Sequence, residues 1–265
     1  LYPTSGTASA EEWNSTQPVG AYSTGPAMNT ARRNMGSVGI STAALAIGGR
    51  APTKANNEQY NGSSWTEVGD LNTARHSMST SGTTTSALSI AGENGGYRNI
   101  VEEWNGSSFS EITDINTTRG EGGGAGANAE AALVYGGGPG NLAVTEEWNG
   151  SAWTEVNDLN TGIIQSTLGL GRTYTAALAV GGRNPPTNYL SKTENWNGTN
   201  WTEVNDLNTG RATAGGQTGS NTSAQAIGGY TGTAYTAANE NWNGVSWVEV
   251  ADLSTGRSGS GGAGA

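Results

Sequence analysis

The residues of this sequence that could do chemistry recur at regular spacing. A glutamate stands two residues before an aromatic residue in every copy of one segment, at Glu11, Glu58, Glu102, Glu146, Glu194 and Glu240. A ring of such carboxylates could hold a cation or a sugar. A buried carboxylate needs a partner, however, and an arginine opens most of the copies, so we expect each glutamate to form a structural ion pair. In the fourth copy, which has no opening arginine, Arg172 is the expected substitute.

The other recurring residues also have a structural interpretation. The nine tryptophans could stack on sugars, but they occupy equivalent positions of the repeated segment, and we expect them in a core where each buries about 150–250 Å². The repeated aspartates lie in no Asp-x-Asp-x-Asp-Gly loop and are expected to cap turns. His76 is the only histidine, and there is no cysteine. We therefore expect no metal site, no cofactor and no catalysis.

The repeated segment defines the organisation of the chain. Its anchor aromatic residue stands at Trp13, Tyr60, Trp104, Trp148, Trp196 and Trp242, so the copies are 44 to 48 residues apart. A period in this range indicates a repeat architecture. Complete units are predicted at 30–72, 73–116, 117–160, 161–208 and 209–254.

Each unit is expected to contain four strands. The first unit runs from Thr30 through a stretch of small residues to an apolar run closed by Gly48-Gly49, and then to two aromatic-bearing runs joined at Asn61-Gly62. Alternating small and branched residues predict strands, and Asn-Gly is a strong hairpin signal. A two-residue turn there would pair Glu58 with Trp65.

The two ends of the chain are expected to form one more unit. Residues 255–265 match the opening strand of a unit, and residues 1–29 match the closing half, so together they lack only the Ala-Leu-x-x-Gly-Gly strand. Four-stranded units without helices are best buried by radial packing. The sequence therefore predicts a single all-β domain over 1–265, a propeller of six blades of four antiparallel strands with one blade assembled from both termini.

The repeated residues resemble the kelch repeat. The match consists of an opening arginine, a Gly-Gly pair, Glu-x-Tyr/Trp and a closing aromatic residue, and it covers essentially the whole chain. Ala91-Gly92 departs from the Gly-Gly pair, and the fourth unit has Ile163 in place of the arginine. The near-identity of the units is similar to kelch-like repeats of phage virion, tail-fibre and other environmental surface proteins. The resemblance implies a kelch-type propeller and leaves its function open.

Composition excludes some partners. The net charge is −10 with only two lysines, so the basic surface that a nucleic acid needs is missing. No apolar run approaches the roughly 18 residues of a membrane span, and we expect no membrane insertion.

The segments between the second and third strands vary in length, whereas the Asn-Gly turns do not. Variable loops on a rigid scaffold favour ligand binding. These segments and the links between blades, which bear Arg33 and His76, are predicted to share one face. The candidate ligand-binding residues on that face are Arg50, Lys54, His76, Tyr97, Arg98, Arg183, Tyr189, Lys192, Tyr230 and Tyr235.

Low charge, the bias toward small polar residues and the absence of cysteine favour a non-enzymatic binding module at an extracellular or virion surface, similar to part of a phage tail fibre. Its expected partner is a cell-surface glycan or protein. The alternative is a purely structural fibre or capsid-decoration subunit that contacts copies of itself.

Overall fold

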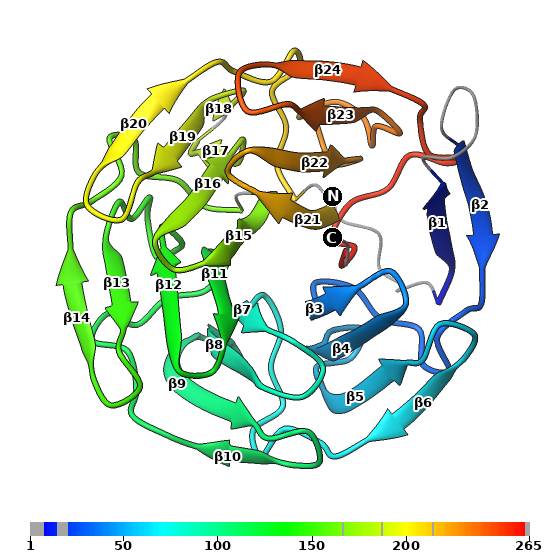
Figure 1. The fold of residues 1–265 in the computed structure, drawn as a ribbon, viewed down its shortest axis with the longest axis vertical. Coiled ribbons are helices and arrows are strands. Elements are labelled where there is room, and N and C mark those ends of the chain that lie inside the picture. Colours follow the sequence, from blue (N-terminus) through cyan, green and yellow to red (C-terminus); the bar gives the residue numbers. More distant parts are fainter. Residues whose placement is uncertain (1–7, 15–20, 166, 187, 214, 263–265) are drawn as a thin grey trace.

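The computed structural model describes residues 8–14, 21–165, 167–186, 188–213 and 215–262. These residues form strands and turns without a helix, and five four-stranded antiparallel sheets are arranged around a common axis (Figure 1). No helix that could span a membrane occurs among these residues. The all-β propeller predicted from the repeats is therefore confirmed.

The strands of each blade follow one another from the axis to the rim. The first three blades are β3 (Gly36–Ile40), β4 (Ala43–Gly49), β5 (Lys54–Tyr60) and β6 (Trp65–Val68); β7 (Ser79–Gly82), β8 (Ala87–Glu93), β9 (Tyr97–Trp104) and β10 (Phe109–Glu111); and β11 (Gly123–Asn128), β12 (Ala131–Tyr135), β13 (Thr145–Trp148) and β14 (Trp153–Val156). The last two are β15 (Thr167–Thr173), β16 (Ala176–Val180), β19 (Thr193–Trp196) and β20 (Trp201–Val204); and β21 (Gly215–Ser220), β22 (Ser223–Ile227), β23 (Asn239–Trp242) and β24 (Trp247–Val250). A short hairpin, β17 (Arg183–Asn184) with β18 (Asn188–Tyr189), extends a loop of the fourth blade.

The hairpin between the two outer strands differs from the predicted two-residue turn. In the first blade Tyr60 pairs with Trp65, and Glu58 pairs with Glu67. The side-chain oxygen of Asn61 accepts hydrogen bonds from the backbone N–H groups of Ser63 and Ser64, at 3.0 and 2.9 Å. This side-chain turn holds four residues in the loop and shifts the register by two. The aromatic residues consequently lie opposite each other, with ring centroids 5.1 Å apart.

The tryptophans pack between blades, as predicted. One core cluster joins Leu88 and Ile90 of the second blade to Val134, Trp148 and Trp153 of the third. The other blade contacts repeat this arrangement, and the buried tryptophans are Trp104, Trp148, Trp153, Trp196, Trp201, Trp242 and Trp247. Trp65 is partly exposed, and the side chain of Trp13 lies outside the described part of the chain.

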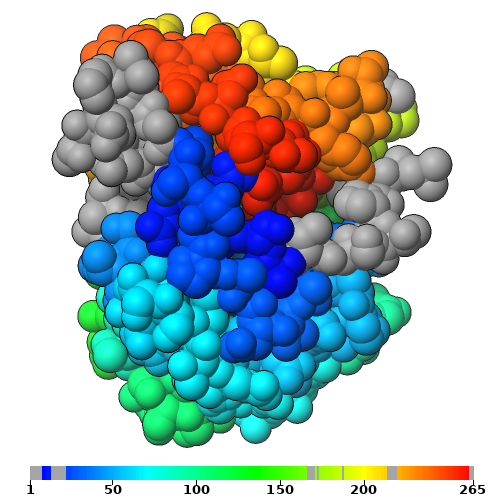
Figure 2. Space-filling model, turned by 90° about the vertical axis from the view of Figure 1, so that its right-hand side faces the viewer, coloured from blue at the N-terminus to red at the C-terminus, as the bar shows by residue number. Residues whose placement is uncertain are grey.

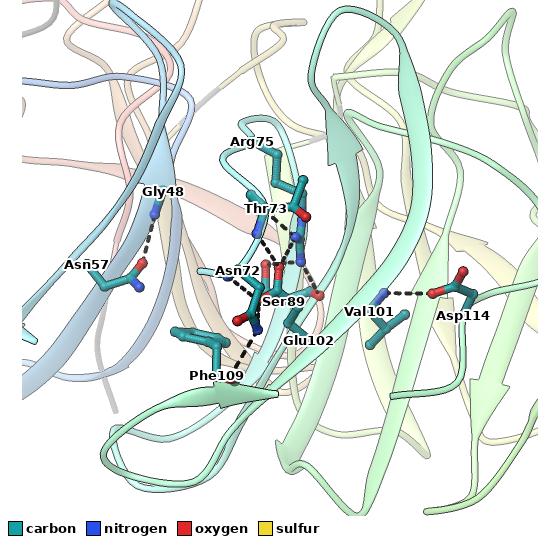
Figure 3. Close-up of polar contacts among 10 residues, drawn as sticks. All are labelled: Gly48, Asn57, Asn72, Thr73, Arg75, Ser89, Val101, Glu102, Phe109 and Asp114. Atoms are coloured by element: carbon teal, nitrogen blue, oxygen red, sulfur yellow. Dashed lines mark hydrogen bonds and ion pairs between the residues drawn. The ribbon is translucent and has the colours of Figure 1, made fainter. Parts of the chain in front are cut away.

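A buried Arg–Glu pair joins the entrance of a blade to its third strand. In the second blade the guanidinium of Arg75 contacts the carboxylate of Glu102 and donates to the carbonyl oxygen of Ser89 at 3.0 Å (Figure 3). The same carboxylate accepts from the backbone N–H groups of Asn72 and Thr73. The predicted pairing is also present at Arg32–Glu58, Arg119–Glu146, Arg211–Glu240 and Arg257–Glu11.

A closed ring of backbone hydrogen bonds surrounds the axis. One residue of each link between blades donates its N–H to the carbonyl oxygen of the equivalent residue in the neighbouring link, at 2.8 to 3.0 Å. The six residues are Asn34, Ser77, Glu121, Gln165, Thr213 and Gly259, all with φ between 49 and 65°. The ring therefore has six positions, and Gly259 near the C-terminal end of the described chain closes it.

The prediction of six four-stranded blades is corrected. Among the described residues, five blades have four strands, and the sheet at the sixth position is the two-stranded one of β1 (Ala10–Asn14) and β2 (Ala21–Gly25). These strands lie against the C-terminal residues, blue beside red in Figure 2. Both ends of the chain meet there, since Ser254 and Arg257 contact Glu11. Neither 1–29 nor 255–265 contains a segment of the Ala-Leu-x-x-Gly-Gly type, which forms the second strand in other blades.

Candidate ligand-binding face

One face of the propeller combines the links that enter the blades with the loops between second and third strands. Single antiparallel bridges tie each link to a loop, at Arg33 with Arg50, His76 with Glu93, Gly120 with Gly138, Ile164 with Arg183 and Ala212 with Tyr230. We call this surface the loop face. The sequence-based expectation that these two sets of segments share a face agrees with this arrangement.

Ionisable side chains gather where the loop face meets the axis. Glu121 accepts a hydrogen bond from the side-chain amide of Gln165 at 2.8 Å, and Arg183 donates to the amide oxygen of Gln165 at 3.5 Å. Burial raises the pKa of Glu121, while the hydrogen bond from Gln165 and the nearby Arg183 and Arg50 act in the opposite direction. The site thus holds a carboxyl group in a setting that disfavours its charge.

A second carboxyl group and the single histidine lie beside this one. Burial, with the charge of Glu121, raises the pKa of Glu93, against which Arg50 acts. Burial and then the charges of Arg50 and Arg33 lower the pKa of His76 to about 4, so the imidazole is neutral at physiological pH. Its Nδ1 lies 3.0 Å from the hydroxyl of Ser77. Perturbed titratable groups gathered in one place are typical of functional sites.

Tyr97 completes this axial cluster. Burial, followed by the charges of Glu121 and Glu93, raises the pKa of its hydroxyl, which therefore stays protonated. Its hydroxyl lies close to Gly138, because a Cβ at that glycine would lie 2.5 Å from the Tyr97 oxygen and would displace the tyrosine ring. We call Arg50, His76, Glu93, Tyr97 and Glu121 the axial cluster.

Three tyrosines form a second group on the loops of the fourth and fifth blades. Tyr189 lies edge-on to Tyr230 with ring centroids 5.5 Å apart, and Tyr230 lies 5.2 Å from Tyr235. The guanidinium carbon of Arg183 is 5.4 Å from the centre of the Tyr189 ring, within cation–π range. All four side chains are partly exposed. We call them the tyrosine cluster.

The structure brings together seven of the ten predicted residues. Arg50, His76 and Tyr97 belong to the axial cluster, and Arg183, Tyr189, Tyr230 and Tyr235 form the tyrosine cluster.

The other three predicted residues belong to neither cluster. The ammonium group of Lys192 pairs with Glu203 on the outermost strand β20. Arg98 is exposed and donates to the carbonyl oxygen of Asn94 within its own loop. Lys54, at the first position of β5, is partly exposed.

Sequence reasoning missed Glu93, Glu121 and Gln165 as candidate site residues. Glu121 lies in the glycine-rich stretch that opens the third unit, where no local pattern marks it. The repeat register holds the missing signal, because Glu121 follows Arg119 by two residues just as Ser77 follows Arg75. The residue two positions after the repeat arginine differs from unit to unit, and reading this position in each unit gives the residues that surround the axis.

The described residues contain no group of three or more His, Cys, Asp or Glu side chains that could hold a metal ion. The two clusters consist of hydrogen-bonding, charged and aromatic groups.

Comparison with known proteins agrees with the fold. A solved structure described as "Structure of YjhT" is similar to this chain with a TM-score of 0.72, covering 92% of this chain and 91% of that one. The sequence identity is 12%, so the likeness shows the β-propeller fold alone. No family model and no curated protein matches the chain.

Proposed function

We propose that this protein is a non-enzymatic binding module that recognises a carbohydrate through its loop face. The observation that carries the proposal is the tyrosine cluster, in which loops of two adjacent blades present contacting tyrosine rings and a guanidinium that are partly exposed to solvent. Tyrosine offers an apolar ring face and a hydroxyl on one rigid side chain, which suits a ligand with both CH surfaces and hydroxyl groups.

The axial cluster supports the same proposal. A protonated tyrosine, two carboxyl groups and an arginine supply hydrogen-bond donors and acceptors next to one another. The backbone beneath them is fixed by the closed ring of hydrogen bonds. A rigid scaffold carrying loops of different length and composition is typical of recognition.

The finer assignments of the repeats belong to the same proposal. We infer that the units are kelch-type, because the Arg–Glu pairs, the positive φ of paired glycines such as Gly48 and Gly49, and the paired aromatic residues each give a structural role to a residue of the repeat pattern. The low fraction of charged residues, the bias toward small polar residues and the absence of cysteine support a place on a virion or another extracellular surface.

The test is binding of the whole chain to a broad glycan array. We expect reproducible binding to a restricted set of glycans that is lost in a Tyr189→Ala/Tyr235→Ala variant, since each change removes a ring of the cluster. Lys192→Ala is the matched control, because its ammonium group pairs with Glu203 away from the cluster. Circular dichroism melting verifies that both variants fold.

Absence of glycan binding together with self-association in sedimentation experiments would overturn the proposal and favour the structural alternative, a subunit that contacts copies of itself. Binding that the tyrosine variant retains and the lysine control loses would place recognition outside the tyrosine cluster.

A further inference from the structure

Among the described residues, the sixth position of the propeller has its innermost and outer parts and shows no strand between them. Residues 258–262 take the inner place, because Gly259 closes the axial ring and Gly262 exchanges hydrogen bonds with the Ser37 hydroxyl at 2.9 and 3.1 Å. β1 and β2 take the third and fourth places, with Glu11 opposite Thr24 and Trp13 opposite Tyr22.

Each complete blade shows what belongs between these parts. A third strand such as β5 pairs with β4 on its inner edge and with β6 on its outer edge. β1 pairs with β2 on its outer edge, and among the described residues no strand pairs with its inner edge. The inner edge of β1 therefore presents a row of backbone donors and acceptors, the arrangement that recruits another strand.

The contacts and exposure of Arg257 are a second, independent observation that a strand is missing beside β1 among the described residues. In the complete blades the repeat arginine donates both to its glutamate and to a carbonyl oxygen of the second strand or the glycine that follows it, at 3.0 to 3.2 Å for Arg32, Arg75, Arg119 and Arg211. Arg257 contacts Glu11 and its own neighbour Thr255. Its side chain is 26% exposed, whereas the other four are fully buried.

We propose that the inner edge of β1 is a strand-binding site, and that its occupant is an extended peptide of the repeat's own second-strand chemistry. That chemistry is an alternation of small and branched apolar residues closed by two glycines, as in Ala43–Gly49, and most of the side chains of this strand are buried in the first four blades. Binding adds a strand through backbone hydrogen bonds, while side-chain size gives specificity. Arg257 then gains the carbonyl oxygen that its equivalents use.

This inference is independent of the proposed carbohydrate function. It concerns the inner edge of β1, whereas the tyrosine cluster lies on loops of the fourth and fifth blades. A variant that loses peptide binding at β1 can therefore still be tested for glycan binding, and a variant that loses glycan binding can still be tested for peptide binding.

The experiment titrates the whole chain into a fluorescein-labelled peptide with the sequence of residues 174–183, which contains strand β16, and follows anisotropy. We expect saturable binding. A control peptide with Leu178→Asp and Val180→Asp should bind at least about tenfold more weakly, because charges would replace two side chains that are buried in the strand's own blade. In the protein, Arg257→Ala should weaken binding of the parent peptide by about tenfold, the usual effect of losing a charged hydrogen bond.

A second measurement covers the case in which the peptide aggregates or Arg257→Ala fails to fold. The same ten residues are joined ahead of Leu1 through a flexible linker, in the parent and in the doubly substituted form. We expect the parent strand to raise Tm by about 5 °C or more and the substituted strand to leave it unchanged. Equal binding of the two peptides, or equal Tm of the two extended proteins, would overturn the proposal.

Discussion

Substitution of the repeat glutamate can separate the contribution of the buried Arg–Glu pair from that of the surrounding hydrogen bonds. The carboxylate of Glu146 accepts from Asn116 N and Nδ2 at 2.7 and 2.8 Å, from Thr117 N at 3.1 Å, and from Arg119 at 2.6 Å. In the fourth blade, Glu194 accepts from the backbone N–H and side-chain amide of Asn160 and from Thr161 N–H, each at 2.8 to 2.9 Å. Ile163 occupies the place of the arginine, and the side chain of Arg172, the expected substitute, lies outside the described part of the chain.

The two Glu→Gln variants therefore differ by one guanidinium among the described side chains. Glu194→Gln replaces a charged acceptor with an amide that faces N–H donors, and we expect a loss of about 1–3 kcal/mol in the free energy of unfolding. Glu146→Gln also leaves Arg119 buried without a counter-charge, and breaking such a pair costs about 3–5 kcal/mol. The expected difference between the variants is about 2 kcal/mol.

Urea unfolding followed by tryptophan fluorescence measures both values, since Trp148, Trp153, Trp196 and Trp201 are buried in these blades. The comparison uses midpoints at equal m-values. Equal destabilisation of the two variants, within about 0.5 kcal/mol, would refute the reasoning that the arginine makes the larger contribution.

Three further outcomes follow from the links and turns. Thr213, a β-branched residue with φ of 49°, should gain about 1 kcal/mol of stability on Thr213→Gly, and a lowered Tm would contradict this. The folded pKa of His76, about 4, lies below its ordinary 6.5, so the protein should lose up to about 3 kcal/mol of stability as pH falls from 6.5 to 4. His76→Gln should flatten that part of the curve of unfolding free energy against pH, and an unchanged slope would exclude the assignment. Asn149→Ala removes the acceptor of the backbone N–H groups of Ser151 and Ala152 and should cost about 1 kcal/mol by urea unfolding, whereas Ser151→Ala, which keeps those bonds, should cost less.

The sequence alone predicts most of the scaffold because residues with the same structural role recur in successive units. Glycines at Gly48 and Gly49, arginine with glutamate, and paired aromatic residues recur with one spacing, and each has a single physical explanation. The hairpin register was predicted wrongly, because the Asn61 side chain forms a turn that Asn-Gly spacing does not reveal.

The candidate site is less predictable because it is built from what does not repeat. The predicted Tyr189, Tyr230 and Tyr235 come together since adjacent loops point to one face, whereas Lys192 turns outward to Glu203. Glu121 reaches the axis through a left-handed backbone position, and its hydrogen bond with Gln165 of the next blade joins residues 44 apart in sequence. Such contacts depend on the closure of the ring, which local patterns do not encode.

The axial ring also determines where the electric field at the loop face originates. Each peptide unit has a dipole of about 3.5 D, and in a helix these dipoles add along one direction. In the axial ring the six hydrogen-bonded N–H and C=O groups follow one another head to tail around a circle, so their dipoles cancel. The electrostatic potential at the loop face consequently comes from side chains such as Arg50, Arg183, Glu93 and Glu121. The charge preference for a ligand can therefore change by substitution of single loop residues while the blades stay the same.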